Sequence, residues 1–230
     1  MSGEMHGGHR ARMKQRYRTQ GLDGFDDHNV LELLLYYAIP RQDVNPIAHR
    51  LMERFGSLRA VFDASPEELQ QVPGVGENAA TLIKLMTDVN RRYLIDRGKR
   101  KTRPCLGETQ AAGEFFLPYF HGIREERVYV AFLDDAFRLL ACREMFEGGV
   151  NFAMLSVRKL VEAALAEHAT NLILAHNHPA GQALPSFEDR ETTLTVARAL
   201  QAVQLNLLDH IIVAEDEYIS MEECGYFARK

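Results

Sequence analysis

The chain has 230 residues, of which 46% are hydrophobic and 26% are charged, a size and composition that fit one large or two small folded domains and exclude a disordered chain. The net charge of −5 is unevenly divided: residues 1–103 hold 17 Lys and Arg against 13 Asp and Glu (+4), and residues 104–230 hold 10 against 19 (−9). The first half is therefore the half suited to an anionic partner.

The sequence predicts neither export nor membrane insertion. Its three cysteines, Cys105, Cys142 and Cys224, are widely spaced, which favours neither a disulfide framework nor a thiolate zinc site. The N-terminus lacks the apolar core of a signal peptide. The longest apolar stretch, residues 30–39, is too short to span a bilayer. We therefore expect a cytoplasmic protein without membrane contact.

Residues 1–20 are polar and basic, which is typical of a frayed terminus or a solvated helix face, and we assign no role to His6 or His9. Apolar residues at helical spacing then predict core helices over residues 27–37 and 45–55, and a short helix over residues 57–62. At Ser65, a serine followed by proline and by a glutamate three residues on predicts a capped helix start.

Val72-Pro73-Gly74-Val75-Gly76 joins that short helix to a longer one expected over residues 77–93, and it resembles the helix-hairpin-helix motif. Gly74 and Gly76 allow close approach of the backbone to another surface, and the amides that open the second helix can hold a phosphate oxygen. The other interpretation is a purely structural hairpin, which Glu77 supports because it stands where a cation would help a phosphate. We keep nonspecific DNA contact and a scaffold role as equal alternatives.

A basic segment over residues 97–104 is the predicted linker between a helical domain (residues 1–96) and a second domain (residues 105–230). It includes the consecutive cations Lys99, Arg100 and Lys101. The segment fits a solvated tether better than a source of extra phosphate contacts, and both interpretations stay open.

The second domain alternates helical and strand patterns. We expect helices over residues 109–120, 155–168 and 186–203, a hairpin of strands 127–133 and 137–146, a central strand over residues 171–178, and strands at 210–213 and 217–220. Strands interleaved with helices and containing a hairpin predict a mixed α+β fold, not a strictly parallel sheet.

The central strand carries the strongest functional pattern. It ends in His176-Asn177-His178, and the period of two in a strand places both imidazoles on one face. After a turn rich in Pro and Gly, a helix is expected to start at Ser186, which puts Asp189 in its first turn, able to reach back. Two histidines and a carboxylate with one open position are typical of a catalytic Zn²⁺ site, although such ligands also hold other divalent metals.

Each part of this pattern also has a structural interpretation. Ser186-x-x-Asp189 before an apolar helix is close to a capping box, in which the two side chains serve the helix end. An isolated His-x-His can be two polar residues at the end of a strand. The spacing between His178 and Asp189 is what favours a metal site.

His176-x-His178 followed after seven residues by Ser186-x-x-Asp189 resembles the JAMM motif of the JAB/MPN metalloprotease domain. Together with Asp209-His210-Ile211-Ile212 and the helix-hairpin-helix segment, it makes the chain similar to the bacterial RadC-like (UPF0758) proteins over residues 21–225. This resemblance implies a layered, cytidine-deaminase-like mixed α/β domain that binds zinc and hydrolyses peptide or isopeptide bonds in a protein or peptide substrate.

The resemblance also assigns catalytic roles to two residues. It implies that Glu144 is the base that activates water and that Ser186 stabilises the oxyanion. Glu147 is the rival of Glu144; the two face opposite sides if the strand is regular, so only one can reach the metal. His210 is expected near the site as a contact of a ligand or as a core residue, not as a fourth ligand.

A second hypothesis concerns binding and not catalysis. The family's old name implies DNA repair, so the helix-hairpin-helix domain would contact DNA phosphates while the JAB domain binds a metal or a partner without turnover. Glu144 favours the enzyme, because a pure binding module has no need for a water-activating carboxylate.

Overall fold

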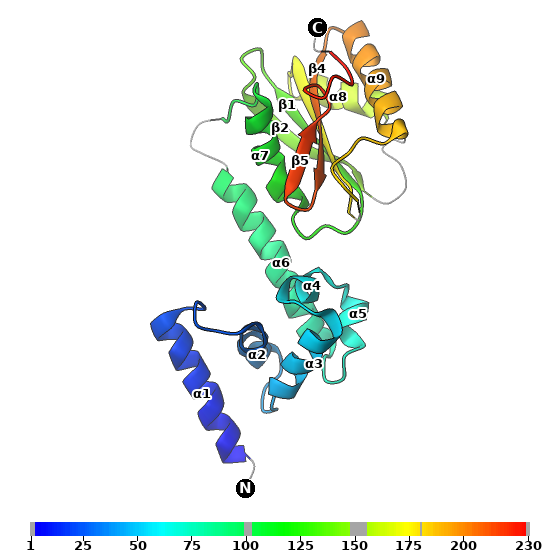
Figure 1. Ribbon diagram of the computed structural model, residues 1–230. Coiled ribbons are helices and arrows are strands. Elements are labelled where there is room, and N and C mark those ends of the chain that lie inside the picture. The colour runs from blue at the N-terminus through cyan, green and yellow to red at the C-terminus, as the bar shows by residue number, and fades with distance from the viewer. Residues whose placement is uncertain (1–2, 99–102, 148–155, 180, 229–230) are drawn as a thin grey trace. The chain divides into compact units, whose positions relative to one another are not determined.

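The structure is a computed structural model that describes residues 3–98, 103–147, 156–179 and 181–228 (Figure 1). The chain forms two compact units, Met1–Asn90 and Arg91–Lys230. The division lies within one long helix, close to the predicted boundary at residue 96. Residues 99–102 of the predicted linker, with Lys99, Arg100 and Lys101, lie outside the described residues.

The first unit is helical, as expected. Leu31 and Leu35 pack against Ile47, Leu51 and Ile83 in a core with no solvent exposure, because apolar side chains spaced three and four residues apart share one side of a helix. The helices are α1 (Gly3–Gln20), α2 (Asp27–Ala38), α3 (Asn45–Phe55), α4 (Leu58–Asp63), α5 (Pro66–Gln70) and α6 (Glu77–Gly98), which continues past the unit's boundary.

The N-terminal helix α1 corrects one expectation. His9, to which we assigned no role, places Nε2 3.0 Å from Oε1 of the fully buried Glu32 on α2. Arg10 donates to the carbonyl oxygens of Ile39 at 3.1 Å and of Gln42 at 2.9 Å, just past the C-terminal end of α2. A buried carboxylate needs such partners, so α1 is held by polar contacts to the first unit.

The helix-hairpin-helix segment has the predicted local structure. Ser65 and Glu68 form the reciprocal capping box at the start of α5. Gly74 has φ of +95°, which favours glycine, and a Cβ there would lie 2.8 Å from Cδ1 of Ile47. A Cβ at Gly76 would meet no atom within 4 Å. Gly74 is thus required by the packing of the unit itself, whereas the space around Gly76 is open.

The second unit is built on a five-stranded sheet in the order β2-β1-β3-β4-β5. Only β3 and β4 pair in parallel, because α9 connects them as a crossover, and the other neighbours are antiparallel. The strands are β1 (Arg127–Leu133), β2 (Leu139–Glu147), β3 (Asn171–Asn177), β4 (Asn206–Ala214) and β5 (Glu217–Ser220). The mixed sheet confirms the predicted α+β class.

Helices cover both faces of this sheet (Figure 1). On one face, here called the α7 face, α7 (Thr109–Phe120) packs through Phe116 onto Ile173 and Ile211. On the other, the α8–α9 face, α8 (Val157–Ala166) and α9 (Phe187–Ala202) cover Leu172 and Leu174. Among the helices of the described residues, none combines the length and the apolar composition needed to cross a membrane.

Candidate metal centre

The two histidines lie at the end of β3, the strand in the middle of the sheet. All seven residues of β3 are buried, and Leu172 and Leu174 belong to the core under α8 and α9. His176 follows them with the period of two and therefore points to the same face. His176 is fully buried, whereas the side chain of His178, just past the strand, is 22% exposed. Solvent can therefore reach the site beside His178 but not beside His176.

Asp189 is brought to the histidines by the start of α9. Ser186 is the N-cap residue, and its Oγ accepts a hydrogen bond from the backbone N–H of Asp189 at 3.1 Å. In return, the backbone N–H and the hydroxyl of Ser186 each donate to Oδ2 of Asp189 at 2.7 Å. The capping box predicted from the sequence is present. It fixes the carboxylate of Asp189, which is 3% exposed, on the α8–α9 face.

The three side chains converge on one point. Nε2 of His176 lies 2.9 Å from Nε2 of His178 and 3.2 Å from Oδ1 of Asp189, and His178 Nε2 lies 3.4 Å from Oδ2 of Asp189. A tetrahedral zinc site with ligands at about 2.0–2.1 Å has about 3.3 Å between ligand atoms. Among the described residues, this is the one group of three or more His, Cys, Asp or Glu close enough to share an ion. The donor set and its spacing fit zinc.

The electrostatics of the group match those of a cation site. Burial opposes ionisation of Asp189, but hydrogen bonds with His176 and His178 outweigh it and lower the pKa of the carboxyl far below its usual range. The hydrogen bond to Asp189 raises the pKa of His178 despite its partial burial. The site therefore holds a carboxylate whose negative charge attracts a positive one, either a proton on the histidines or a metal ion.

Behind the ligands lies His210, which the sequence placed near the site. Its register opposite Leu174 puts it on the same face as His176, and its Nε2 is 2.8 Å from Nδ1 of His176. Burial, and then the neighbouring His176, lower the pKa of His210 well below its ordinary value, so the ring is neutral. His210 therefore contacts the candidate ligand His176, and it stays a prediction that His210 is not itself a ligand.

Thr193 contacts both His210 and Asp189, which the sequence did not predict. Its Oγ1 lies 2.7 Å from Nδ1 of His210 and donates to the backbone oxygen of Asp189 at 2.5 Å. The one available signal was its position four residues after Asp189, since that spacing places it one turn further along the same side of α9.

Glu144, predicted as the base, is not brought to these ligands. Its carboxylate accepts hydrogen bonds from Nη1 of Arg127 at 3.2 Å and from the hydroxyl of Tyr129 at 3.0 Å. Tyr129 packs on the rings of Tyr119 and Phe120 of α7, with centroids 5.1 and 5.3 Å away. Glu144 thus lies on the α7 face, whereas the histidines lie on the α8–α9 face.

The strand that carries Glu144 and Glu147 is irregular. The β1–β2 register passes from Val128↔Phe146 to Tyr129↔Glu144, which leaves Met145 as a bulge. The condition under which Glu144 and Glu147 were expected on opposite faces is therefore not met. Glu147 pairs with Arg127 in the backbone register, and its side chain lies outside the described residues.

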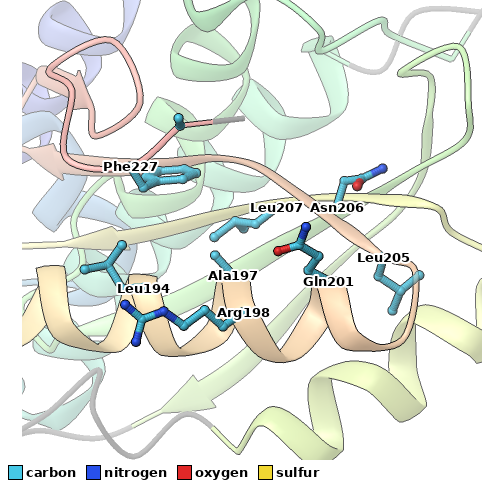
Figure 2. Close-up of a pocket in the computed structure, with 9 residues that line it drawn as sticks. Leu194, Ala197, Arg198, Gln201, Leu205, Asn206, Leu207 and Phe227 are labelled. Carbon is cyan, nitrogen blue, oxygen red and sulfur yellow. The ribbon is translucent and has the colours of Figure 1, made fainter. Parts of the chain in front are cut away.

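A cavity of about 220 Å³ lies beside the middle and the C-terminal part of α9 (Figure 2). None of the three candidate ligands lines it, and its polar groups, among them Arg198 and Gln201, include no His, Cys, Asp or Glu. It is therefore separate from the candidate metal centre. Its apolar lining comes from Leu194, Ala197, Leu205, Leu207, Phe227 and Ala228.

Comparison with protein families gives two matches. Residues 106–226 match the RadC-like JAB domain, and residues 57–85 match the helix-hairpin-helix motif. The first match covers the sheet, α7 to α9 and the three candidate ligands. The second covers α4, α5, the hairpin with Gly74 and Gly76, and the first part of α6.

Curated relatives align with nearly the whole chain. A UPF0758 protein of Fusobacterium nucleatum is 33% identical over 230 residues, which are 98% of this chain and 99% of the relative. A UPF0758 protein of Burkholderia thailandensis is 34% identical over 214 residues, 93% of this chain and 80% of the relative. One from Burkholderia mallei is likewise 34% identical over 214 residues, 93% of this chain and 76% of the relative.

Proposed function

This chain belongs to the RadC-like JAB domain family, with a helix-hairpin-helix motif in its first unit, and from that premise we propose that it is a zinc-dependent hydrolase of peptide or isopeptide bonds. The observation that carries the proposal is the convergence of His176, His178 and Asp189, whose ligand atoms lie within 4.8 Å of one another. The substrate class, a protein or peptide, comes from the family resemblance.

In this proposal His176, His178 and Asp189 hold the ion. Zinc bound there supplies a Lewis acid that polarises a peptide carbonyl and acidifies water. The hydroxyl of Ser186 donates its one proton to Oδ2 of Asp189, so to stabilise the carbonyl oxygen as that atom gains negative charge it must turn from Asp189 to the substrate. The partial exposure of His178 supports this assignment, because a substrate must reach the ion from outside.

We propose Glu144 as the base that takes a proton from the attacking water, and the support for this role is the motif alone. Its contacts with Arg127 and Tyr129 on the α7 face do not support it. To act as the base, Glu144 must give up both contacts and reach the α8–α9 face.

Metal analysis of the purified full chain tests the site. We expect about one zinc per wild-type chain and loss of it in His178→Ala and Asp189→Asn, since each removes one of three ligands. Arg158→Ala, at an exposed position on α8, is the control. A wild-type chain that binds no zinc even when titrated with it, while remaining folded, overturns the proposal.

Turnover separates the two candidate bases. A mixed peptide library incubated with zinc-loaded protein and read by mass spectrometry gives the rate of cleavage, with a chelator as the blank. Glu144→Gln is expected to keep zinc and to lower the rate about 100-fold or more, while Glu147→Gln keeps both. The reverse result would assign the base to Glu147. Zinc binding without cleavage of any peptide would favour a binding module.

DNA association is a second candidate function, favoured by the match of residues 57–85 to the helix-hairpin-helix motif. Gly76 supports it because the space around it is open, whereas Gly74 is explained by its packing on Ile47. The net charge of +4 over residues 1–103 has the sign that phosphates require.

Fluorescence anisotropy with duplex DNA over a series of salt concentrations tests this function. We expect affinity to fall steeply as salt rises, and charge reversal of Lys99, Arg100 and Lys101 to reduce both the affinity and the salt slope. The control is Arg158→Glu in the second unit, which should bind as the wild type does. Absence of binding at low salt rules the function out.

A further inference from the structure

A row of buried hydrogen bonds connects two of the candidate ligands behind the metal centre. It runs from His176 Nδ1 to His210 Nε2 at 2.8 Å, from His210 Nδ1 to Thr193 Oγ1 at 2.7 Å, and from Thr193 Oγ1 to the backbone oxygen of Asp189 at 2.5 Å. His176, Thr193 and His210 have no solvent exposure. Each atom in the row is therefore held by protein atoms and shielded from water.

The chain fold explains why these groups meet. β4 lies beside β3 in parallel register, which brings His210 next to His176. Thr193 lies one helical turn after Asp189 on α9, so its hydroxyl reaches back to the Asp189 carbonyl. One row of contacts thus connects β4 with β3 and α9, the two elements that carry the candidate ligands His176 and Asp189.

The directions of the hydrogen bonds follow from the ends of the row. The backbone oxygen of Asp189 can only accept, so Thr193 donates to it and its oxygen is left to accept from Nδ1–H of His210. Met221 Sδ, at 3.5 Å, is a more distant and weaker acceptor for the same hydroxyl.

A neutral imidazole has one N–H and one bare nitrogen. With its proton on Nδ1, His210 presents a bare Nε2, which accepts from Nδ1–H of His176. Without a metal, Oδ1 of Asp189 can accept a hydrogen bond from Nε2 of His176 only if that nitrogen carries a proton. With a metal, His176 is left with a bare Nε2, the atom that lies 2.9 Å from His178 Nε2 and 3.2 Å from Asp189. That is the only neutral form of His176 in which Nε2 can bind a metal.

We propose that Thr193 and His210 are positioning residues, which fix His176 in its metal-binding tautomer and hold the backbone of Asp189 in the same network. This inference rests on the proposed metal site and deepens it. Without the Thr193 hydroxyl, His210 can carry its proton on Nε2 and donate to His176, which moves the proton of His176 onto the atom that must bind the metal.

The test compares Thr193→Val, which keeps the shape and removes the hydroxyl, with Thr193→Ser, which keeps the hydroxyl. Titration of the metal-free full chain with Zn²⁺ should show about tenfold weaker binding for Thr193→Val. Thr193→Ser should bind close to the wild-type affinity. Equal affinities of Thr193→Val and wild type overturn the proposal, as does a Thr193→Ser variant as weak as Thr193→Val, because the hydroxyl would then not be the cause.

A second readout needs neither metal nor a variant. In the nitrogen NMR spectrum of the metal-free wild-type chain, Nδ1 of His176 and Nδ1 of His210 should each carry a proton, and Nε2 of His210 should carry none. A His210 proton on Nε2 overturns the proposal even if Thr193→Val fails to fold. A wild-type chain that binds no Zn²⁺ refutes the proposed function instead, and the tautomers then still decide whether the row is directed as inferred.

Discussion

Tyr129 is, with Arg127, one of the two residues that hold Glu144 on the α7 face. Its hydroxyl donates to Glu144 at 3.0 Å, and its ring packs against Tyr119 and Phe120. Burial, together with the charge of Glu144, raises the pKa of Tyr129 to about 12. In the unfolded chain a tyrosine loses its proton near pH 10. Between about pH 10 and about pH 12, Tyr129 therefore loses its proton more readily in the unfolded chain, and this ionisation favours unfolding.

The contribution of Tyr129 to the stability of the fold decreases at alkaline pH. Because the folded pKa is raised, the stability linked to Tyr129 is fully present below about pH 10 and is lost as the pH rises to about 12. Denaturant unfolding over this range should show a smaller alkaline loss for Tyr129→Phe than for wild type. Tyr17→Phe, at a position 46% exposed in the first unit, is the control. Equal losses in all three proteins would contradict the assignment.

The position of a single residue in the fold can be predicted from the sequence in some cases and not in others. His176, His178 and Asp189 were predictable because a strand's period and a helix's first turn are local geometry. The face occupied by Glu144 was not, because the bulge at Met145 depends on pairing with β1. The role of His9 was not predictable either, since its partner Glu32 lies on another helix.

At the scale of elements, the start of α9 is a helix cap that also contains a candidate metal ligand. Two capping boxes of the same kind occur among the described residues, Ser65 with Glu68 at α5 and Ser186 with Asp189 at α9. Each serine accepts a backbone N–H that the helix itself cannot pair. Only at α9 is the acidic partner also a candidate ligand, so the two helices offer a matched comparison.

Ser186→Ala and Ser65→Ala are each expected to lower the free energy of unfolding by about 1 kcal/mol, the usual effect of losing an N-cap. Zinc affinity should fall in Ser186→Ala alone, because Asp189 loses the hydroxyl that donates to its Oδ2. Denaturant unfolding in chelator measures the first effect and zinc titration the second. A loss of zinc affinity in Ser65→Ala as well would show that weakened folding, not the position of Asp189, is responsible.

The bounds of most elements were predictable within a few residues because their sequence patterns are local. The start of β4 was not predictable in this way. The strand was expected from residue 210 but begins at Asn206, and it therefore includes the charged residue Asp209. Asp209 is fully buried and accepts hydrogen bonds from the hydroxyl of Ser220 at 2.7 Å and the backbone N–H of Glu222 at 3.2 Å. A polar residue in a strand core is stabilised by partners that the local sequence does not reveal.

At the scale of the whole molecule, the chain has two compact units with separate hydrophobic cores. Leu31, Leu51 and Ile83 belong to the core of the first unit, whereas Leu172 and Ile211 belong to cores of the second. All three candidate metal ligands are in the second unit. A ligand stabilises the part of a chain whose folded form binds it, so zinc should act on one unit only.

Differential scanning calorimetry of the full chain should therefore resolve two transitions, of which zinc raises one. At a free zinc concentration about 100 times the dissociation constant, the gain in unfolding free energy is about 2.7 kcal/mol. In His178→Ala the zinc-dependent shift should disappear, while the other transition keeps its midpoint, because that substitution leaves the first unit's core intact. A single transition that moves as a whole with zinc would mean that the two cores unfold together. The long helix α6, which crosses the boundary at Asn90, is the element that would then connect them.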